Sequence, residues 1–211
     1  MVDIDEVCTN NRVATFFIVL YCLSTVLVPV FILNKLVFLP LFLVSISLLF
    51  LRSAITFAPL LVVSVFVYGY FLGVLTGADV DLGRQMVFSS SALLLIYFID
   101  NFKVDMSRAV KVTGAVFALL MCGLSFLLML LPGSALGTEL LNYYNVNELG
   151  FYGVRNFGGL QMFMLHHRSS PFLLVPLSLF FIDFFFLKKI RELFFVIVIL
   201  TDIVCSASRA L

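Results

Sequence analysis

Residues 55–75 read ITFAPLLVVSVFVYGYFLGVL, a run without a single charged side chain. A helix needs about 20 mainly apolar residues to cross the roughly 30 Å of bilayer hydrocarbon, and this run meets that length. The whole chain is 63% hydrophobic and only 12% charged, with a mean hydropathy of +1.17. A water-soluble domain carries far more polar residues. The sequence therefore predicts an all-α, polytopic integral membrane protein.

Similar apolar runs occur along the rest of the chain. Together with residues 55–75, they predict membrane spans over residues 13–33, 36–51, 85–99, 110–131, 171–187 and 192–209. This gives a bundle of about seven transmembrane helices. No fixed-period repeat or low-complexity linker divides it, so we expect one domain over residues 1–211. The largest segment between predicted spans covers residues 133–170.

Basic residues in short loops predict the orientation, because they favour the cytoplasmic side. Two clusters lie at loops on one side of the predicted membrane: Lys103, Arg108 and Lys111, and Lys188, Lys189 and Arg191. We therefore expect a cytoplasmic N-terminus and an external loop over residues 133–170. In a bacterium, this describes a multi-pass protein of the inner membrane with one larger periplasmic loop.

The composition and motifs also exclude several classes of function. The formal net charge of +1 shows no basic excess for binding nucleic acid, so no such partner is expected. The four cysteines show no CxxC spacing, and the sequence contains neither a phosphate-binding GxxxxGK[ST] motif nor an HExxH motif. We therefore expect no metal and no cofactor. A transferase of this kind would draw its donor from the membrane.

The external loop contains most of the residues that could carry chemistry. Arg155 lies among glycines, and Arg168 ends the loop. Both arginines run against the charge bias, which an anionic ligand would explain, because guanidinium forms bidentate hydrogen bonds to phosphate. The alternative for Arg168 is an anchor to lipid head groups. We interpret these two residues as candidates for binding an anionic ligand through its phosphate oxygens.

The same loop offers candidates for a general base. His166 and His167 are the chain's only histidines, and imidazole titrates near neutral pH. The alternative for each histidine is an interfacial residue with satisfied ring nitrogens. As a metal site the histidine pair is a weak signal, because adjacent helical residues point about 100° apart.

The last predicted span carries a polar stripe. Asp202, Ser206 and Arg209 are spaced i, i+4 and i+7, so an α-helix places them on one face. Ionisable residues within a span usually face the interior of a bundle. We therefore expect this face to point into the bundle, where Ser206 could relay between Asp202 and Arg209. The alternative is a stripe of small residues that packs against another helix.

Three segments, taken in order, resemble the bacterial O-antigen polymerases and O-antigen ligases. They are Arg155-Asn156-Phe157-Gly158-Gly159, His167-Arg168-Ser169-Ser170-Pro171 and Ser206-Ala207-Ser208-Arg209-Ala210. The Phe- and Leu-rich membrane chain adds to the resemblance. Members of this family are usually longer, so the chain is expected to be a partial protein that lacks a second large periplasmic loop and the final spans.

The resemblance implies a glycosyltransferase at the periplasmic face of the inner membrane. The donor would be an oligosaccharide repeat unit on undecaprenyl diphosphate, and the acceptor would be another repeat unit, as in O-antigen or capsular polysaccharide polymerisation. Transfer to lipid A-core by a ligase is the alternative within the family, in lipopolysaccharide assembly. Because the leaving group would be a diphosphate, the resemblance implies diphosphate ligands, namely Arg155, Arg168 and Arg209, supported by Asp202, Ser206 and Ser208. It also implies a base for the acceptor hydroxyl, namely His166, His167 or Glu148. Membrane lipids and a chain-length regulator protein are the further partners expected. Two other classes stay open, namely a transporter or flippase of lipid-linked glycans and a non-catalytic membrane subunit.

Overall fold

A computed structural model describes residues 4–28, 32–51, 57–131, 134–157 and 160–207. The chain is 85% helical, and within these ranges five helices are long and apolar enough to cross a membrane. These candidate spans are Asn34–Leu51, Phe57–Leu75, Val80–Asn101, Met106–Leu130 and Ser170–Leu187. The chain is therefore a helical, membrane-associated protein. The count of about seven spans and the orientation stay predictions.

The fold divides into two compact units, of residues 1–17 with 35–106 and of residues 18–34 with 107–211. Helix α1 (Ile4–Leu27) contributes to both. We describe each unit by itself, and the single domain over residues 1–211 stays a prediction.

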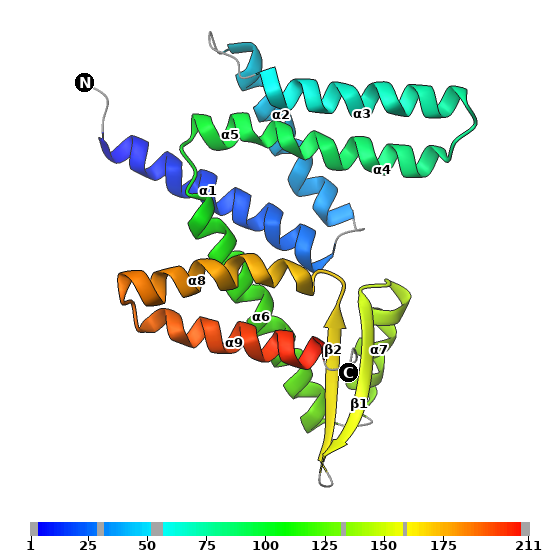
Figure 1. The fold of residues 1–211 in the computed structure, drawn as a ribbon, viewed down its shortest axis with the longest axis vertical. Helices are drawn as coiled ribbons and strands as arrows, with labels where there is room; N and C mark the ends of the chain where they lie inside the picture. The colour runs from blue at the N-terminus through cyan, green and yellow to red at the C-terminus, as the bar shows by residue number, and fades with distance from the viewer. Residues whose placement is uncertain (1–3, 29–31, 52–56, 132–133, 158–159, 208–211) are drawn as a thin grey trace. The chain divides into compact units, whose positions relative to one another are not determined.

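The first unit consists mainly of helices (Figure 1). They are α2 (Ile32–Leu51), α3 (Phe57–Leu75), α4 (Val80–Ser91), the 3₁₀ turn η1 (Ala92–Leu94) and α5 (Leu95–Asn101). Helix α4 begins before the predicted span at residue 85, because the Asp79 carboxylate accepts hydrogen bonds from the backbone N–H groups of Asp81 and Leu82 at 2.9 and 3.4 Å. Between α3 and α4 the chain turns at Gly77, whose φ of +81° suits glycine.

The second unit contains the predicted external loop and the helices on either side of it. Its elements are α6 (Met106–Leu130), α7 (Ala135–Val146), β1 (Gly150–Phe157), β2 (Leu160–His167), the 3₁₀ turn η2 (Ser170–Leu173), α8 (Leu174–Leu187) and α9 (Arg191–Ala207). Helices α6 and α8 are joined by an ion pair of 2.7 Å between Lys111 Nζ and Asp183 Oδ2. Lys189 Nζ lies 3.3 Å from the same oxygen.

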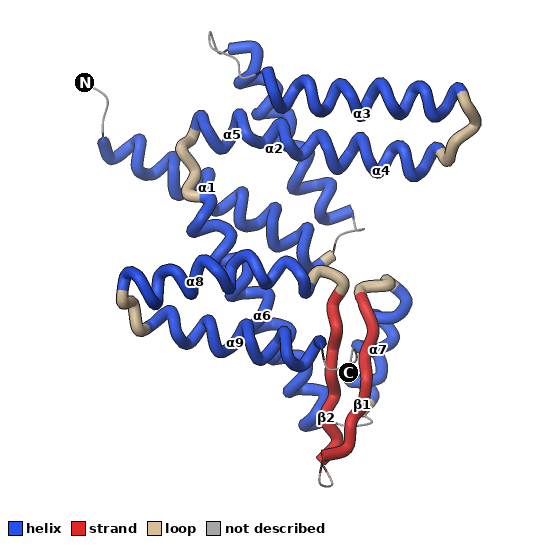
Figure 2. The backbone as a smooth tube through the Cα atoms, in the orientation of Figure 1, coloured by secondary structure: helices blue, strands red, loops and turns tan. Residues whose placement is uncertain are grey.

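The predicted external loop, residues 133–170, is more regular than its sequence suggests. Strands β1 and β2 form a two-stranded antiparallel hairpin, shown in red in Figure 2, with the register running from Gly150 opposite His167 to Phe157 opposite Leu160. One face of its open end is buried, where Leu165 is 1% and His167 2% exposed. The hairpin packs on α7 and α9. The all-α prediction is thus correct for the spans and incomplete for this loop.

Candidate functional site

The hairpin register separates the predicted site residues into two groups. Glu148, His166, His167 and Arg168 lie at the open end of the hairpin. Arg155 lies opposite Met162, near the other end of β1. At about 3.3 Å per residue, its backbone is roughly 16 Å along the strand from Gly150. The side chain of Arg155 lies outside the described part of the structure.

An exposed ion pair joins two of the predicted residues at the open end. Arg168 Nη1 lies 3.7 Å from Glu148 Oε2, and the two side chains are 62% and 77% exposed. A backbone hydrogen bond also holds Arg168 close to Glu148, because the N–H of Arg168 donates to the carbonyl of Leu149 at 2.8 Å. A carboxylate and a guanidinium that are distant in sequence thus lie side by side and face outward.

Glu148 also has an unusual backbone conformation. Its φ is +49°, in the left-handed region, directly after the C-terminal end of α7. A side chain in this region costs roughly 1–2 kcal/mol relative to glycine. Lys103 and Lys188 adopt the same conformation. The left-handed conformation is therefore one that the chain adopts at helix ends. Glycine would adopt it at position 148 with less strain than glutamate.

His167 is held by two hydrogen bonds in a neutral form. Its Nε2 lies 3.1 Å from the carbonyl oxygen of Leu27, and its Nδ1 accepts from the N–H of Ser169 at 3.1 Å. A ring that accepts at Nδ1 carries its proton at Nε2, which then donates to Leu27. Burial lowers the pKa of His167, and the nearby His166 lowers it further, against the opposing effect of the Leu27 hydrogen bond. In this arrangement, neither nitrogen is available to take a proton from a substrate.

Aromatic rings complete the surroundings of His167. The ring of Phe117 on α6 lies edge-on at 5.2 Å, and that of Tyr144 on α7 at 5.9 Å, both measured between ring centroids. Leu27 is the last residue of α1, so its carbonyl lacks a partner within that helix. His167 thus connects the hairpin to the end of α1, to α6 and to α7.

Several buried polar groups have no hydrogen-bond partner among the described residues. Two of them influence one another, namely the hydroxyl of Tyr144, a residue 4% exposed, and Oδ2 of Asp202 on α9, a residue 3% exposed. Burial raises the pKa of Tyr144, and the negative charge of Asp202 raises it further. Buried polar groups are rarely left unpaired, so these two point to a small polar site behind the hairpin.

The other predicted residues are placed less completely. His166 is half-buried opposite Phe151, on the face of the hairpin away from His167. Ser206 lies in α9, one helical turn after Asp202, but its side chain lies outside the described residues. Ser208 and Arg209 lie entirely outside them. In the described ranges, no group of three or more His, Cys, Asp or Glu side chains could hold a metal ion.

Tyr144 is the residue that the sequence analysis missed. Its contact with His167 depends on α7 folding back towards the hairpin, and no motif around it indicates this. Comparisons with protein-family models, curated proteins and solved structures give no match to the chain.

Proposed function

We propose that the chain polymerises oligosaccharide repeat units carried on undecaprenyl diphosphate, at the periplasmic face of a bacterial inner membrane. The observation that carries the proposal is the exposed pair of Glu148 and Arg168 at the open end of the hairpin. Glycosyl transfer from a diphosphate requires a base for the acceptor hydroxyl and a cation for the leaving group. The pair supplies one of each within 3.7 Å.

In the proposed reaction, Glu148 accepts the proton of an acceptor hydroxyl as the oxygen attacks the anomeric carbon of the donor. The bond between that carbon and the diphosphate oxygen breaks, and its electron pair leaves with undecaprenyl diphosphate. Arg168 binds the departing diphosphate through its forked N–H groups. Proton, glycosyl group and leaving group are then all accounted for.

The remaining predicted residues take supporting roles in this proposal. His167 positions Arg168, the next residue, through its bonds to Leu27 and Ser169. Arg155 and Arg209 remain proposed ligands of the donor's phosphate or glycan. A chain-length regulator would act as a protein partner. Transfer to lipid A-core would make the same site a ligase.

The test compares substitutions at the pair with a matched exposed pair elsewhere. Glu148→Gln removes the base, and Arg168→Ala removes the cation. Arg84 is the control, because it forms an equally exposed ion pair, 3.4 Å from Asp81, in the first unit. The readout is the length distribution of lipid-linked glycan on a gel, in cells whose only copy of the gene encodes the variant.

We expect short products from Glu148→Gln and Arg168→Ala, and chains of normal length from Arg84→Ala at equal protein level. Arg168→Lys should give glycan chains nearly as short as those of Arg168→Ala, since lysine lacks the bidentate geometry. Glu148→Gly is the most informative variant, because it relieves the left-handed backbone yet removes the carboxylate. A Glu148→Gly protein that is more stable and still makes long chains would refute the proposal. Loss of lipid A-core attachment with normal chain length would favour the ligase.

A further inference from the structure

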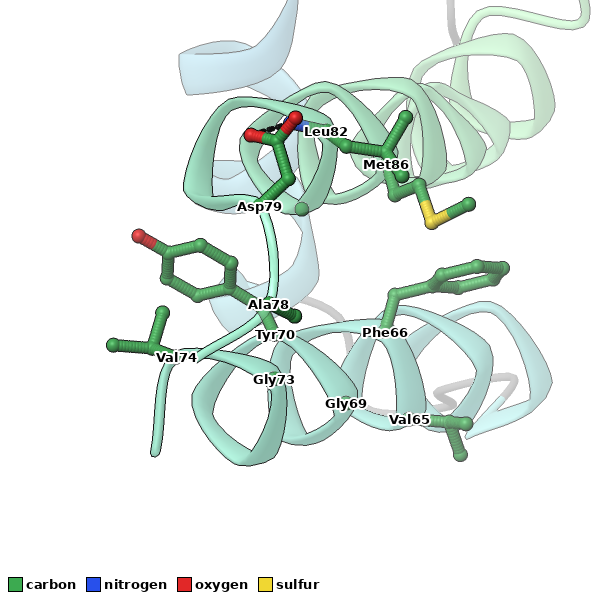
Figure 3. Close-up of a pocket in the computed structure, with 11 residues that line it drawn as sticks. Val65, Phe66, Gly69, Tyr70, Gly73, Val74, Ala78, Asp79, Leu82 and Met86 are labelled. Atoms are coloured by element: carbon green, nitrogen blue, oxygen red, sulfur yellow. Dashed lines mark hydrogen bonds between the residues drawn. The ribbon is translucent and has the colours of Figure 1, made fainter. Parts of the chain in front are cut away.

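A half-open cavity of about 400 Å³ lies between α3 and α4 in the first unit. Figure 3 shows that Phe66 on α3 and Met86 on α4 face one another across it. Gly69 and Gly73 form part of its floor on α3, and Asp79 lies at one end. The lining is thus apolar apart from its end at the turn, which is the usual character of a ligand pocket, and the volume lies within the usual range.

The shape of the cavity restricts what can fill it. Its lining on α3 extends from Val65 to Val74, about 13 Å at 1.5 Å per residue. The cavity is therefore a groove along α3 that is long enough for one extended chain.

The surroundings indicate that the chain is a hydrocarbon. Helix α3 has no buried residue along its length, although it is apolar on every side. In a membrane-associated protein such a surface faces lipid. A Cβ atom added at Gly69 would meet nothing within 4 Å, so the space above this glycine is open.

The polar end of the cavity favours a particular head group. Asp79 ends the lining, and Asp81 follows it in the first turn of α4. Asp81 pairs with Arg84 at 3.4 Å, which leaves Asp79 without a cationic partner among the described side chains. Asp79 Oδ1 accepts the N–H groups of Asp81 and Leu82 as the N-cap of α4, but no described cationic side chain neutralises the carboxylate. A primary ammonium group would complement it and could also donate hydrogen bonds to the carboxylate.

We propose that the cavity between α3 and α4 binds one acyl chain of a bilayer phospholipid whose primary-amine head group lies against Asp79. The proposal does not depend on the glycosyl transfer proposed for the second unit. It adds a lipid site formed by Phe66, Gly69, Gly73, Leu82 and Met86.

Native mass spectrometry of the full chain in detergent tests this site. The probes are phosphatidylethanolamine, phosphatidylcholine and phosphatidylglycerol with identical acyl chains. Gly69→Leu fills the cavity from its floor, and Gly69→Ala fills it in part. Gly123→Leu is the matched control, because Gly123 is also an exposed helical glycine with nothing within 4 Å of an added Cβ, on α6. Asp79→Asn removes the charge and keeps a good N-cap.

We expect one molecule of phosphatidylethanolamine to be retained per chain. The other two lipids should bind about two- to fivefold more weakly, because an exposed ion pair contributes only this much to affinity. Gly69→Leu should reduce retention to the background of nonspecific adducts, Gly69→Ala should give an intermediate value, and Gly123→Leu should have no effect. Asp79→Asn should remove the preference between head groups. The proposal would be overturned if Gly69→Leu retained phosphatidylethanolamine as well as the unmodified chain does. It would also be overturned if the chain formed a dimer that Gly69→Leu alone abolished, because a second copy of the chain would then fill the cavity. Equal retention of all three lipids by the unmodified chain would overturn the head-group assignment.

Discussion

His167 makes the stability of the second unit sensitive to acid. Its ring is neutral and buried, with Nε2 facing the Leu27 carbonyl and Nδ1 accepting from the Ser169 N–H. Protonation at Nδ1 would set an N–H against the N–H of Ser169 and would bury a charge. The hydrogen-bond geometry and the burial thus favour the same neutral ring.

The sign and size of the effect follow from proton linkage. Burial lowers the pKa of His167 below its ordinary value of 6.5 in the folded chain. Between the lowered pKa and about 6.5, the unfolded chain binds more protons than the folded chain, so the free energy of unfolding falls as the pH falls. The slope approaches about 1.4 kcal/mol per pH unit for one group. Above pH 6.5 both states are neutral, and the full contribution of His167 is present.

Unfolding in detergent micelles between about pH 5 and pH 8 measures this slope. The chain has no tryptophan, so far-UV circular dichroism is the appropriate signal. Glutamine supplies a donor and an acceptor but does not titrate, so His167→Gln should remove the contribution of His167 to the slope below pH 6.5. His166→Gln is the control and should keep it. Equal slopes in the unmodified chain and His167→Gln would refute the reasoning.

Three substitutions test the packing of the second unit. Gly150→Ala should prevent normal pairing at the open end of the hairpin and lower the melting temperature, because the added Cβ would overlap the carbonyl oxygen of His166. Asp183→Asn should also lower the melting temperature, since it removes the partner of Lys111. Tyr144→Phe should change the free energy of unfolding by less than about 1 kcal/mol, because the hydroxyl that it removes has no described partner.

Each of these substitutions has a matched control, and thermal unfolding is the measurement throughout. Gly123→Ala should stabilise slightly, by up to about 1 kcal/mol of helix propensity. Asp81→Asn should have a smaller effect than Asp183→Asn, because the Asp81 side chain is 83% exposed. Tyr143 is the exposed neighbour of Tyr144, so Tyr143→Phe measures the change in stability caused by removing an exposed hydroxyl. A large loss of stability in Tyr144→Phe would indicate that a bound water or ligand satisfies the buried hydroxyl.

The apolar spans could be predicted because their signal is local. A run such as residues 57–75 needs only its own composition to predict a membrane helix, and the structure has a helix there. The start of α4 depended on one side chain, Asp79, which extends the helix ahead of the apolar run. An Asp at this place is a recognised N-cap signal, so the earlier start could have been predicted.

The hairpin was missed although the sequence carries a signal for it. Gly158-Gly159 separates two eight-residue segments, and a Gly-Gly pair between such runs is typical of a two-residue β-turn. The same glycines also surround Arg155, which drew attention to a binding site instead of a turn. Pairing along the strands is a contact between distant residues, which composition alone does not report. The contact of Tyr144 with His167 is less predictable still, since it depends on how α7 packs on the finished hairpin.

The hairpin also changes the meaning of the arginine pattern. In the sequence, Arg155 and Arg168 share one loop, which suggested that both bind one diphosphate. The register instead places Arg155 opposite Met162, roughly 16 Å along the strand from Gly150, while Arg168 follows directly after His167 at the open end. Because the Arg168 side chain pairs with Glu148, the leaving group and the base belong together at the open end in the proposed reaction. Arg155 would then contact a more distant part of an extended donor or acceptor. On that reasoning, Arg168→Ala should lower kcat, whereas Arg155→Ala should mainly raise KM, because a contact remote from the breaking bond contributes similarly to binding in the ground and transition states.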